Sequence, residues 1–460
     1  MKNNNDWQHK RMLETPMSKL ITSLAIPTTI SQLITTIYNT ADTYFVSQIG
    51  TSSAAAVGIV FSLMSIIQAF GFGFGMGANS IISRKLGAKE EEEANLYGNS
   101  AFFAAILFGF FLMIAGLPNI KALMRLLGST ETILPYACDY GKYILVGAPI
   151  MCSAFVLNNI LRSEGDATLA MWGLCIGGII NMFLDPLFIF VFDMGISGAA
   201  LATVISQLVS FLILLSIFLR NRTIVKLKIS YVSKNLKDYF LIVKIGFPTI
   251  CRQMLGSIAS ALINVKAAVY GDAAIAAVTI ANKIYMLVRN IILGLGQGFQ
   301  PVAGYNYGAK NYKRVKEAFV FTCKVGTAIC VLAAIVISLN APEVIKWFRK
   351  DDLEVIAIGT QALYFACAVM PLMAYSTYVN QMYQCLGFSK QATLLASCRQ
   401  GICFIPLIFV LPIIFGLKGI AMAQPGADLL TFAISVPFQI KFFKKFLMIK
   451  EEANKKIVGF

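Results

Sequence analysis

The chain has 460 residues, of which 57% are hydrophobic and only 13% are charged. A soluble protein of this size needs more charged and polar residues to cover its surface, so the composition excludes a water-soluble globular protein. The formal net charge of +16 is expected to arise from basic cytoplasmic loops of a membrane protein, and no nucleic-acid partner is predicted.

Several classes of enzyme are excluded by the residues that the chain lacks. His9 is its only histidine, so neither a histidine metal site nor a Ser-His-Asp hydrolase is available. No phosphate-binding lysine loop is present, so the chain carries no ATPase of its own. Its ten cysteines are scattered singly and are expected to be buried thiols. We expect no catalytic residues, no enzymatic activity and no cofactor.

Apolar segments long enough to cross a bilayer, which takes about 20 residues, recur along the whole chain. The sequence predicts twelve spanning helices, at 20–47, 53–83, 97–117, 136–161, 168–191, 198–219, 239–264, 273–303, 314–339, 355–386, 391–415 and 418–440. Prolines inside these segments are expected to kink helices rather than end them.

The distribution of lysine and arginine predicts the orientation in the membrane. With a cytoplasmic N-terminus, the inside loops carry 25 of the 39 basic residues and the outside loops carry 6. Basic loops stay in the cytoplasm, so both termini are expected there. The protein is expected in the plasma (inner) membrane as a multi-pass protein surrounded by lipid.

The sequence contains an internal repeat with a shift of 221 residues. Without a gap, Pro27 aligns with Pro248 and the segment 87–89 (Gly-Ala-Lys) aligns with 308–310. The glycines at 73, 75 and 77 align with those at 294, 296 and 298. The repeat predicts two six-helix bundles related by an axis along the membrane normal, because an even number of spans keeps both halves in one orientation.

The repeat divides the chain into domains. The predicted order is a cytoplasmic tail (1–19), an N-lobe (20–219), a basic cytoplasmic linker (220–238), a C-lobe (239–440) and a basic cytoplasmic tail (441–460). A cavity between two such lobes can open alternately to either side, which is typical of a transporter.

Alternating glycines at 71–77 resemble a nucleotide-binding loop only superficially. Such a loop follows a strand, whereas these glycines lie within a predicted span and recur in the second half. Close packing of helices is therefore expected for them.

Four polar residues in the first half are costly to place in a membrane. Asp42 and Asp185 are ionisable, and Asn181 lies one helical turn before Asp185. Together with Thr203 they fall at a similar depth below the outer surface, so they are expected to converge. Two carboxylates in a dry site cannot both ionise easily, so the group is expected to bind a proton, or Na⁺ if the protein is sodium-coupled. A purely structural cluster is the alternative.

By register, the second half has no copy of this group, because its counterparts are Ile263, Ile402, Pro406 and Gln424. Its spans are expected to carry basic residues instead. Lys244, Arg252, Lys324 and Arg399 are expected to extend to the cytoplasmic surface. Lys283 and Arg289 lie deeper and are candidates for lining a cavity or pairing with an acid.

Long segments carry a resemblance to a known family. They include 181–190 (NMFLDPLFIF), 270–284 (YGDAAIAAVTIANKI), 294–310 (GLGQGFQPVAGYNYGAK) and 397–401 (SCRQG). The chain resembles the MATE (multidrug and toxic compound extrusion) transporters, in particular the DinF-like and MepA-like branch.

The resemblance implies two lobes in a V with a central cavity, and export of cationic or amphipathic drugs in exchange for H⁺ or Na⁺. It implies an ion site at Asp42, Asn181, Asp185 and Thr203, and a helix that bends at Pro27. We expect a monomer.

Three alternatives remain: a lipid-linked oligosaccharide flippase of the same broad fold, a carrier of the major facilitator type, and a non-transporting receptor or scaffold. The first would need a strongly cationic cavity, the second lacks its basic loop signature here, and the buried acids disfavour the third.

Overall fold

The computed structural model describes residues 2–220, 222–348 and 352–458, and these residues form helices and loops without a β-strand. The N-lobe consists of α2 (Met17–Ser47), α3 (Thr51–Gly87), α4 (Glu91–Gly116), α6 (Leu134–Ser163), α7 (Ala167–Pro186) with its π-helical extension η1 (Leu187–Val191), and α8 (Gly195–Leu219). The C-lobe consists of α9 (Leu236–Ala268), α10 (Asp272–Gly308), α11 (Tyr312–Leu339), α13 (Leu353–Cys385), the continuous run α14 (Ser389–Ser397), η3 (Cys398–Ile402) and α15 (Phe404–Phe415), and α16 (Leu417–Val458). Shorter elements are α1 (Lys2–Glu14), α5 (Ile120–Leu126), η2 (Ile229–Tyr231) and α12 (Ala341–Lys346).

Eleven of the described helices are long and apolar enough to cross a membrane, and α9 is the predicted span that falls outside this set. The interior of α9 contains Lys244, Arg252 and Gln253, which lower its apolar content. It is nevertheless a 33-residue helix, about 50 Å long at the usual rise of about 1.5 Å per residue. A bilayer core is about 30 Å thick, so α9 has the length of the twelfth span.

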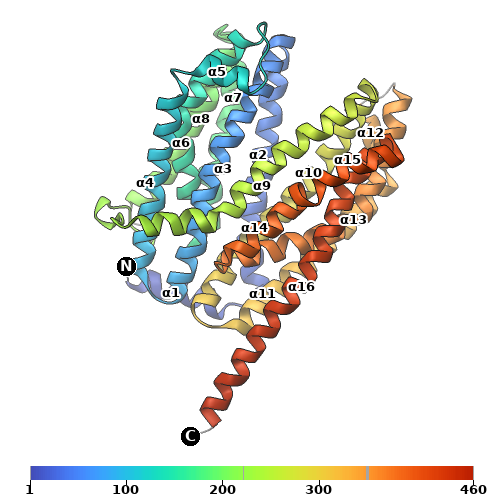
Figure 1. The fold of residues 1–460 in the computed structure, drawn as a ribbon. Coiled ribbons are helices and arrows are strands. Elements are labelled where there is room, and N and C mark those ends of the chain that lie inside the picture. The colour runs from blue at the N-terminus through green and yellow to red at the C-terminus, as the bar shows by residue number, and fades with distance from the viewer. Residues whose placement is uncertain (1, 221, 349–351, 459–460) are drawn as a thin grey trace.

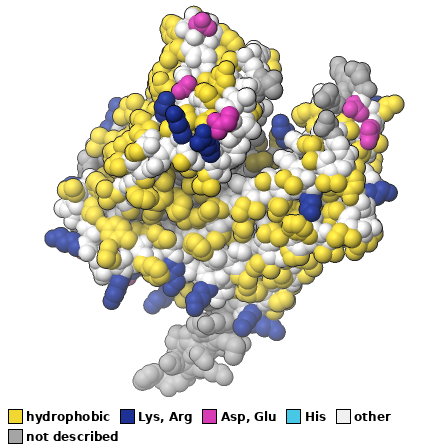
Figure 2. Space-filling view, turned by 45° about the horizontal axis from the view of Figure 1, so that its top comes forward, with side chains coloured by type: hydrophobic (Ala, Val, Ile, Leu, Met, Phe, Trp, Pro, Cys, Tyr) yellow, Lys and Arg dark blue, Asp and Glu magenta, His cyan; other side chains and the backbone are white. Residues whose placement is uncertain are grey.

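The two lobes separate toward the end of the molecule that carries α5 and α12, and they meet at the end that carries both termini (Figure 1). On the open side, Figure 2 shows a hollow between the lobes. The 221-residue repeat is visible in the elements as well, since α5 begins at Ile120 and α12 at Ala341. The predicted all-α architecture of two six-helix bundles is therefore confirmed, in a form open on the side opposite the termini.

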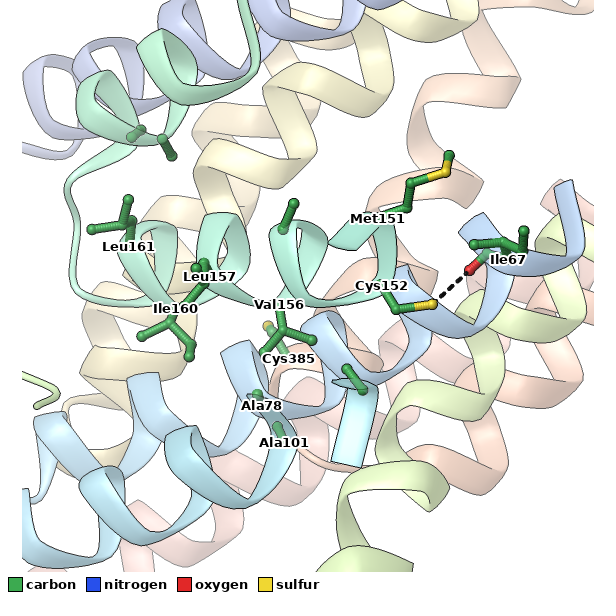
Figure 3. Packing of buried hydrophobic residues seen from close by; sticks show 14 of the residues in the cluster. Ile67, Ala78, Ala101, Met151, Cys152, Val156, Leu157, Ile160, Leu161 and Cys385 are labelled. Atoms are coloured by element: carbon green, nitrogen blue, oxygen red, sulfur yellow. Dashed lines mark hydrogen bonds between the residues drawn. The ribbon is translucent and has the colours of Figure 1, made fainter. Parts of the chain in front are cut away.

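The N-lobe is built around α6, whose apolar segment is 89% buried. Figure 3 shows side chains of α6, among them Cys152, Val156 and Ile160, among neighbours from adjacent helices such as Ala78 and Ala101. Burial at about 25 cal/mol per Å² of apolar surface does not by itself favour packing over lipid. Close packing of small residues therefore supplies much of the attraction between these helices.

Glycines hold the lobes together at a crossing of α3 and α9. A Cβ atom at Gly77 would overlap the carbonyl oxygen of Ile242, and one at Gly246 would overlap that of Gly73. Only glycine allows the two backbones to approach this closely. The predicted role of the glycines at 71–77 in close helix packing is thus confirmed.

The second copy of the glycines forms the equivalent crossing between α10 and α2. A Cβ atom at Gly294 would lie 2.5 Å from the Cα atom of Thr29, and one at Gly298 would lie 2.6 Å from the Cα atom of Ala25. The Thr28 hydroxyl donates a hydrogen bond of 2.7 Å to the Gly294 carbonyl oxygen. Each lobe therefore contributes one glycine-bearing helix to the interface on the closed side.

The linker between the lobes docks on the N-lobe through a buried carboxylate. Glu164, between α6 and α7, is fully buried. Its Oε2 and Oε1 atoms accept hydrogen bonds from the backbone N–H groups of Ile224 (2.9 Å) and Val225 (2.8 Å). Burial raises the pKa of Glu164 to about 8, the two backbone N–H groups oppose this shift, and the nearby Asp166 adds to it.

Replacing Glu164 by glutamine is expected to change how stability depends on pH. Because the pKa of Glu164 is raised on folding, its stabilising contribution is complete below the unfolded value of 4.5 and is lost as pH rises through about 8. Glu164→Gln removes this titration, so the melting temperature of the purified protein should fall less between pH 6 and pH 9 than in the wild type. An unchanged pH profile in Glu164→Gln would contradict the assignment.

The polar N-terminal segment is not a free tail, because it forms α1 and contacts both lobes. The side-chain amide of Gln8 donates a hydrogen bond of 2.7 Å to the Glu164 carbonyl oxygen in the N-lobe. From the C-lobe, Asn306 Nδ2 donates to the Met12 carbonyl oxygen at 3.2 Å, and the Met12 side chain is fully buried. Helix α1 thus adds a third connection between the lobes on the closed side.

Candidate functional site

Three helices of the N-lobe bring the four predicted polar residues together. Asn181 and Asp185 lie one turn apart on α7, and Asn181 Nδ2 donates a hydrogen bond of 3.1 Å to Asp185 Oδ1. The same amide lies 3.5 Å from Thr203 Oγ1 on α8. Asp42, on α2, interacts electrostatically with Asp185. The predicted convergence of these side chains is therefore present in the structure.

Two tyrosines complete the group, and the sequence analysis missed both. Tyr140, on α6, is fully buried, donates a hydrogen bond of 3.4 Å to Asp42 Oδ2 and also interacts with Thr203. Tyr38 lies one turn before Asp42 on α2 and interacts with it electrostatically. Tyr140 lies six residues from the outer end of its helix, a depth similar to that of Asp42 and Asp185. That depth is the sequence signal that could have identified it.

Three oxygen atoms in this group lack a partner. Among the described residues, Asp42 Oδ1, Asn181 Oδ1 and Asp185 Oδ2 are buried and accept no hydrogen bond. Nearly all buried polar atoms in proteins are hydrogen-bonded, and an unpaired carboxylate in a dry site is especially costly. Asp185 is fully buried, and Asn181 and Thr203 are almost so. The arrangement thus presents acceptor oxygens from two helices toward a shared, water-poor place.

The set of ligands favours a proton or a hard monovalent cation. Within the described part of the chain, no group of three or more His, Cys, Asp or Glu residues could hold a metal ion. Two carboxylates, an amide oxygen and a hydroxyl are instead the oxygen ligands that hard cations prefer. Such an ion would be transported by the protein and would not be a resident cofactor.

The expectation that the C-lobe spans hold only basic residues was wrong. Asp428 on α16 is fully buried, and its Oδ1 atom accepts a bond of 2.6 Å from Arg399 Nε in η3. The Tyr285 hydroxyl donates to Asp428 Oδ2, and Gln424 Nε2 lies 3.3 Å from Oδ1. By register Asp428 corresponds to Gln207, one turn away from the position of Thr203, so a search for counterparts of the four N-lobe residues passed over it.

Two basic residues that were expected at the cytoplasmic surface lie instead in the interior of the C-lobe. Arg399 pairs with Asp428, and Arg252 lies close enough to Arg399 for their charges to interact. Arg252 is at the midpoint of α9, about 24 Å along the helix from either end at about 1.5 Å per residue. An arginine side chain is too short to cover that distance, which is why this prediction failed.

The two candidates for cavity lining have different environments. Lys283 is exposed on α10, and no partner in the interior is assigned to it. Arg289, also on α10, is largely buried and interacts electrostatically with Arg252, Arg399, Tyr285 and Asp428. Only Arg289 therefore belongs to the polar interior of the C-lobe.

Pro27 lies at the contact between the lobes. It is buried inside α2, which is an uninterrupted helix from Met17 to Ser47 in this structure. The next residue, Thr28, makes the hydrogen bond to Gly294 of the C-lobe. Bending of α2 at Pro27 would therefore alter the contact between the lobes.

Comparison with known proteins gives the same assignment as the residues. The model of the MatE family matches residues 27–187 and 248–410, two segments that begin 221 residues apart. Curated relatives include the multidrug export protein MepA of Staphylococcus saprophyticus, 28% identical over 86% of this chain and 87% of that protein. MepA of Staphylococcus aureus strain N315 is 28% identical over 88% of this chain and 90% of that protein.

A solved structure with the same architecture is described as an outward-facing conformation of a multidrug resistance MATE family transporter of the MOP superfamily. It is 28% identical, covers 95% of this chain and 98% of its own, and superposes with a TM-score of 0.90. This likeness leaves no room for a carrier of the major facilitator type. The chain belongs to the MatE family of membrane transporters, as its sequence predicted, and it is a transporter and not an enzyme.

Proposed function

We propose that this protein is a secondary active multidrug efflux transporter that exports cationic and amphipathic small molecules in exchange for H⁺ or Na⁺. The relatives named as multidrug export proteins support the export of drugs. The coupling ion binds at Asp42, Asn181, Asp185 and Thr203. The protein acts as a monomer in the plasma membrane with both termini in the cytoplasm.

A single observation carries the coupling part of this proposal. Three buried oxygens of Asp42, Asn181 and Asp185 have no hydrogen-bond partner among the described residues. The C-lobe counterparts of these residues are Ile263, Ile402 and Pro406, so the duplicated fold does not need polar groups at these positions. A cation that binds there would offset the cost of burying the acids, and release of that cation would restore the cost.

Coupling to drug export follows from the place of α2 in the molecule. Helix α2 carries Asp42 of the ion site and, on its other half, Thr28 and Ala25 of the interface with α10. An ion entering from the open side would change the interactions of Asp42. Bending of α2 at Pro27 would pass this change to the contact between the lobes, and the lobes would then expose the site to the cytoplasm.

The energy available to such an exchange is sufficient for accumulation of drugs. Each monovalent charge that moves inward gains about 2.3 kcal/mol per 100 mV of membrane potential. Basic loops on the side of the termini support the orientation that this direction requires, and Figure 2 shows lysine and arginine side chains along the lower margin of that view.

Efflux from proteoliposomes under imposed gradients tests the proposal. The protein is reconstituted with the cationic dye rhodamine 123, and a pH gradient or a Na⁺ gradient is imposed separately. We expect one of the two gradients to drive the dye against its concentration gradient, and dissipation of that gradient to stop transport. If neither gradient drives transport, ion coupling is refuted. A lipid-linked oligosaccharide flippase would also fail to transport the dye.

A further inference from the structure

The C-lobe contains a pocket at the place that corresponds to the N-lobe ion site. It lies between α9, α10, α13 and α16 and has a volume of about 410 Å³, including space open to solvent. Ile263 and Gln424 line it, and they are the register counterparts of Asp42 and Thr203. The duplicated position is therefore an ion site in one lobe and an apolar pocket in the other.

Most of the pocket wall is apolar, with contributions from Val278, Ala281, Ala362 and Ile420. The buried apolar residues around it belong to two separate clusters, one formed mainly by α9, α15 and α16 and the other by α10, α12 and α13. A gap between two small cores leaves room for an apolar molecule, and ligand pockets are commonly apolar with a few polar groups.

At one side the pocket reaches a polar network through Tyr285 and Gln424, which line it and also contact Asp428. The charge of Asp428 is already compensated, because Arg399 Nε binds its Oδ1 at 2.6 Å. A second nitrogen of Arg399, Nη2, donates to the Tyr285 hydroxyl at 3.0 Å. The only acid in the network is thus neutralised by Arg399.

Two further arginines in the network have no acid to balance them. Arg252 and Arg289 both interact electrostatically with Arg399, and among the described residues neither forms an ion pair. The Nε atom of Arg289 is buried and has no hydrogen-bond partner in the described part of the chain. Arginine does not deprotonate in proteins, and an uncompensated charge at this depth is costly.

The position of Arg289 connects the two features. It lies one turn after Tyr285 on α10, and Tyr285 lines the pocket. Arg399, which contacts Tyr285, lies in a π-helical segment, and such segments in helices are frequent at functional sites. An apolar pocket therefore adjoins a group of three arginines and one acid.

We propose that the C-lobe binds the anionic group, a carboxylate or phosphate, of an amphipathic molecule at Arg289 and Arg252, with the apolar part of that molecule in the adjoining pocket. This inference rests on the proposed function, to which it adds zwitterionic and anionic amphiphiles as substrates. The anion supplies the counter-charge that the network lacks. Arginine forms bidentate hydrogen bonds with such groups, which gives the site its specificity.

Two dyes that differ only in one carboxyl group test the proposal. Rhodamine 110 carries a free carboxylate, and rhodamine 123 is its methyl ester. Binding of each dye to the purified full-length protein in detergent is measured by fluorescence anisotropy, which requires no ion gradient. We expect the wild type to bind rhodamine 110 more tightly than the ester.

Arg289→Gln is expected to weaken binding of rhodamine 110 by about tenfold or more, the usual effect of losing a hydrogen bond to a charged group, and to leave binding of the ester unchanged. Retained ester binding also shows that the variant is folded. Arg289→Lys should restore part of the affinity. The matched control is Lys283→Gln, an exposed lysine on the same helix, which should bind both dyes as the wild type does.

The source of the anion is decided by lipid composition. If rhodamine 110 is the ligand, its export from proteoliposomes will be the same with and without phosphatidylglycerol. If phosphatidylglycerol competes with the dye in the wild type but not in Arg289→Gln, the site exists and takes a lipid phosphate.

Equal binding of both dyes to the wild type and to Arg289→Gln would overturn the proposal. That result would leave gradient-driven export of the ester intact, so failure of the anion site is distinguishable from failure of the proposed function.

Discussion

Replacing Asp42 by asparagine is expected to reduce dye efflux by about tenfold or more, to the level of cells without the transporter. The amide keeps the shape of the side chain but removes the charge that captures a cation. Asp185→Asn should have the same effect, because both carboxylates belong to one site. The double variant should be no worse than either single variant, as expected for residues that act as a unit.

The matched control for this prediction is Asp139→Asn. Asp139 directly precedes Tyr140 on α6, but its side chain is 51% exposed and pairs with Lys142 at 3.1 Å. Exposed ion pairs contribute little, about 0–1 kcal/mol, so efflux by this variant should match the wild type. Expression and melting temperature are measured for all variants. Efflux by a well-folded Asp42→Asn protein at half the wild-type rate or more would end the coupling proposal.

Adding one methyl group at the contact between the lobes is the second change with a large expected effect. Gly77→Ala on α3 and Gly298→Ala on α10 are equivalent by the repeat, and each places a Cβ atom against the backbone of the other lobe. Overpacking of this kind costs about 1–3 kcal/mol, and here it would push the lobes apart on their closed side. We expect a lower melting temperature in detergent and at least a severalfold loss of efflux, because the cycle requires this side to close.

Gly58→Ala separates this effect from the ordinary consequence of replacing glycine in a helix. Gly58 lies on α3, as Gly77 does, but a Cβ atom at Gly58 would meet nothing within 4 Å. Alanine favours a helix over glycine by about 1 kcal/mol, so Gly58→Ala should be neutral or slightly stabilising. If Gly77→Ala and Gly298→Ala behave like Gly58→Ala, the glycine crossings do not hold the lobes together as described.

Features that depend on the repeat and on the cost of burying charge were predictable from the sequence. The shift of 221 residues indicated two bundles, and it also indicated that the glycines at both crossings have a packing role. The ion-site residues were found because Asp42 and Asp185 are costly in hydrocarbon and lie at a similar depth. Family membership followed from longer motifs.

Other features depend on contacts that periodicity does not report. Helix α1 is mostly polar, and only its docking on Glu164 and Asn306 shows that it is part of the fold. Tyr140 looks like any aromatic residue in an apolar span. Asp428 was missed because it lies one turn from the register position that was searched. The π-helical segment that carries Arg399 has no distinct sequence signal, so its inward place could not be foreseen.

Displacement of the coupling ion by drug is the most direct test of the central claim, that the buried oxygens of Asp42, Asn181 and Asp185 form the coupling-ion site. Rhodamine 123 is added to the purified protein in weakly buffered detergent solution, and the release of protons, or of bound ²²Na⁺, is measured. The wild type is predicted to release one of these ions on binding the dye, and Asp42→Asn and Asp185→Asn to release neither. Equal ion release by the wild type and by both variants would contradict the account.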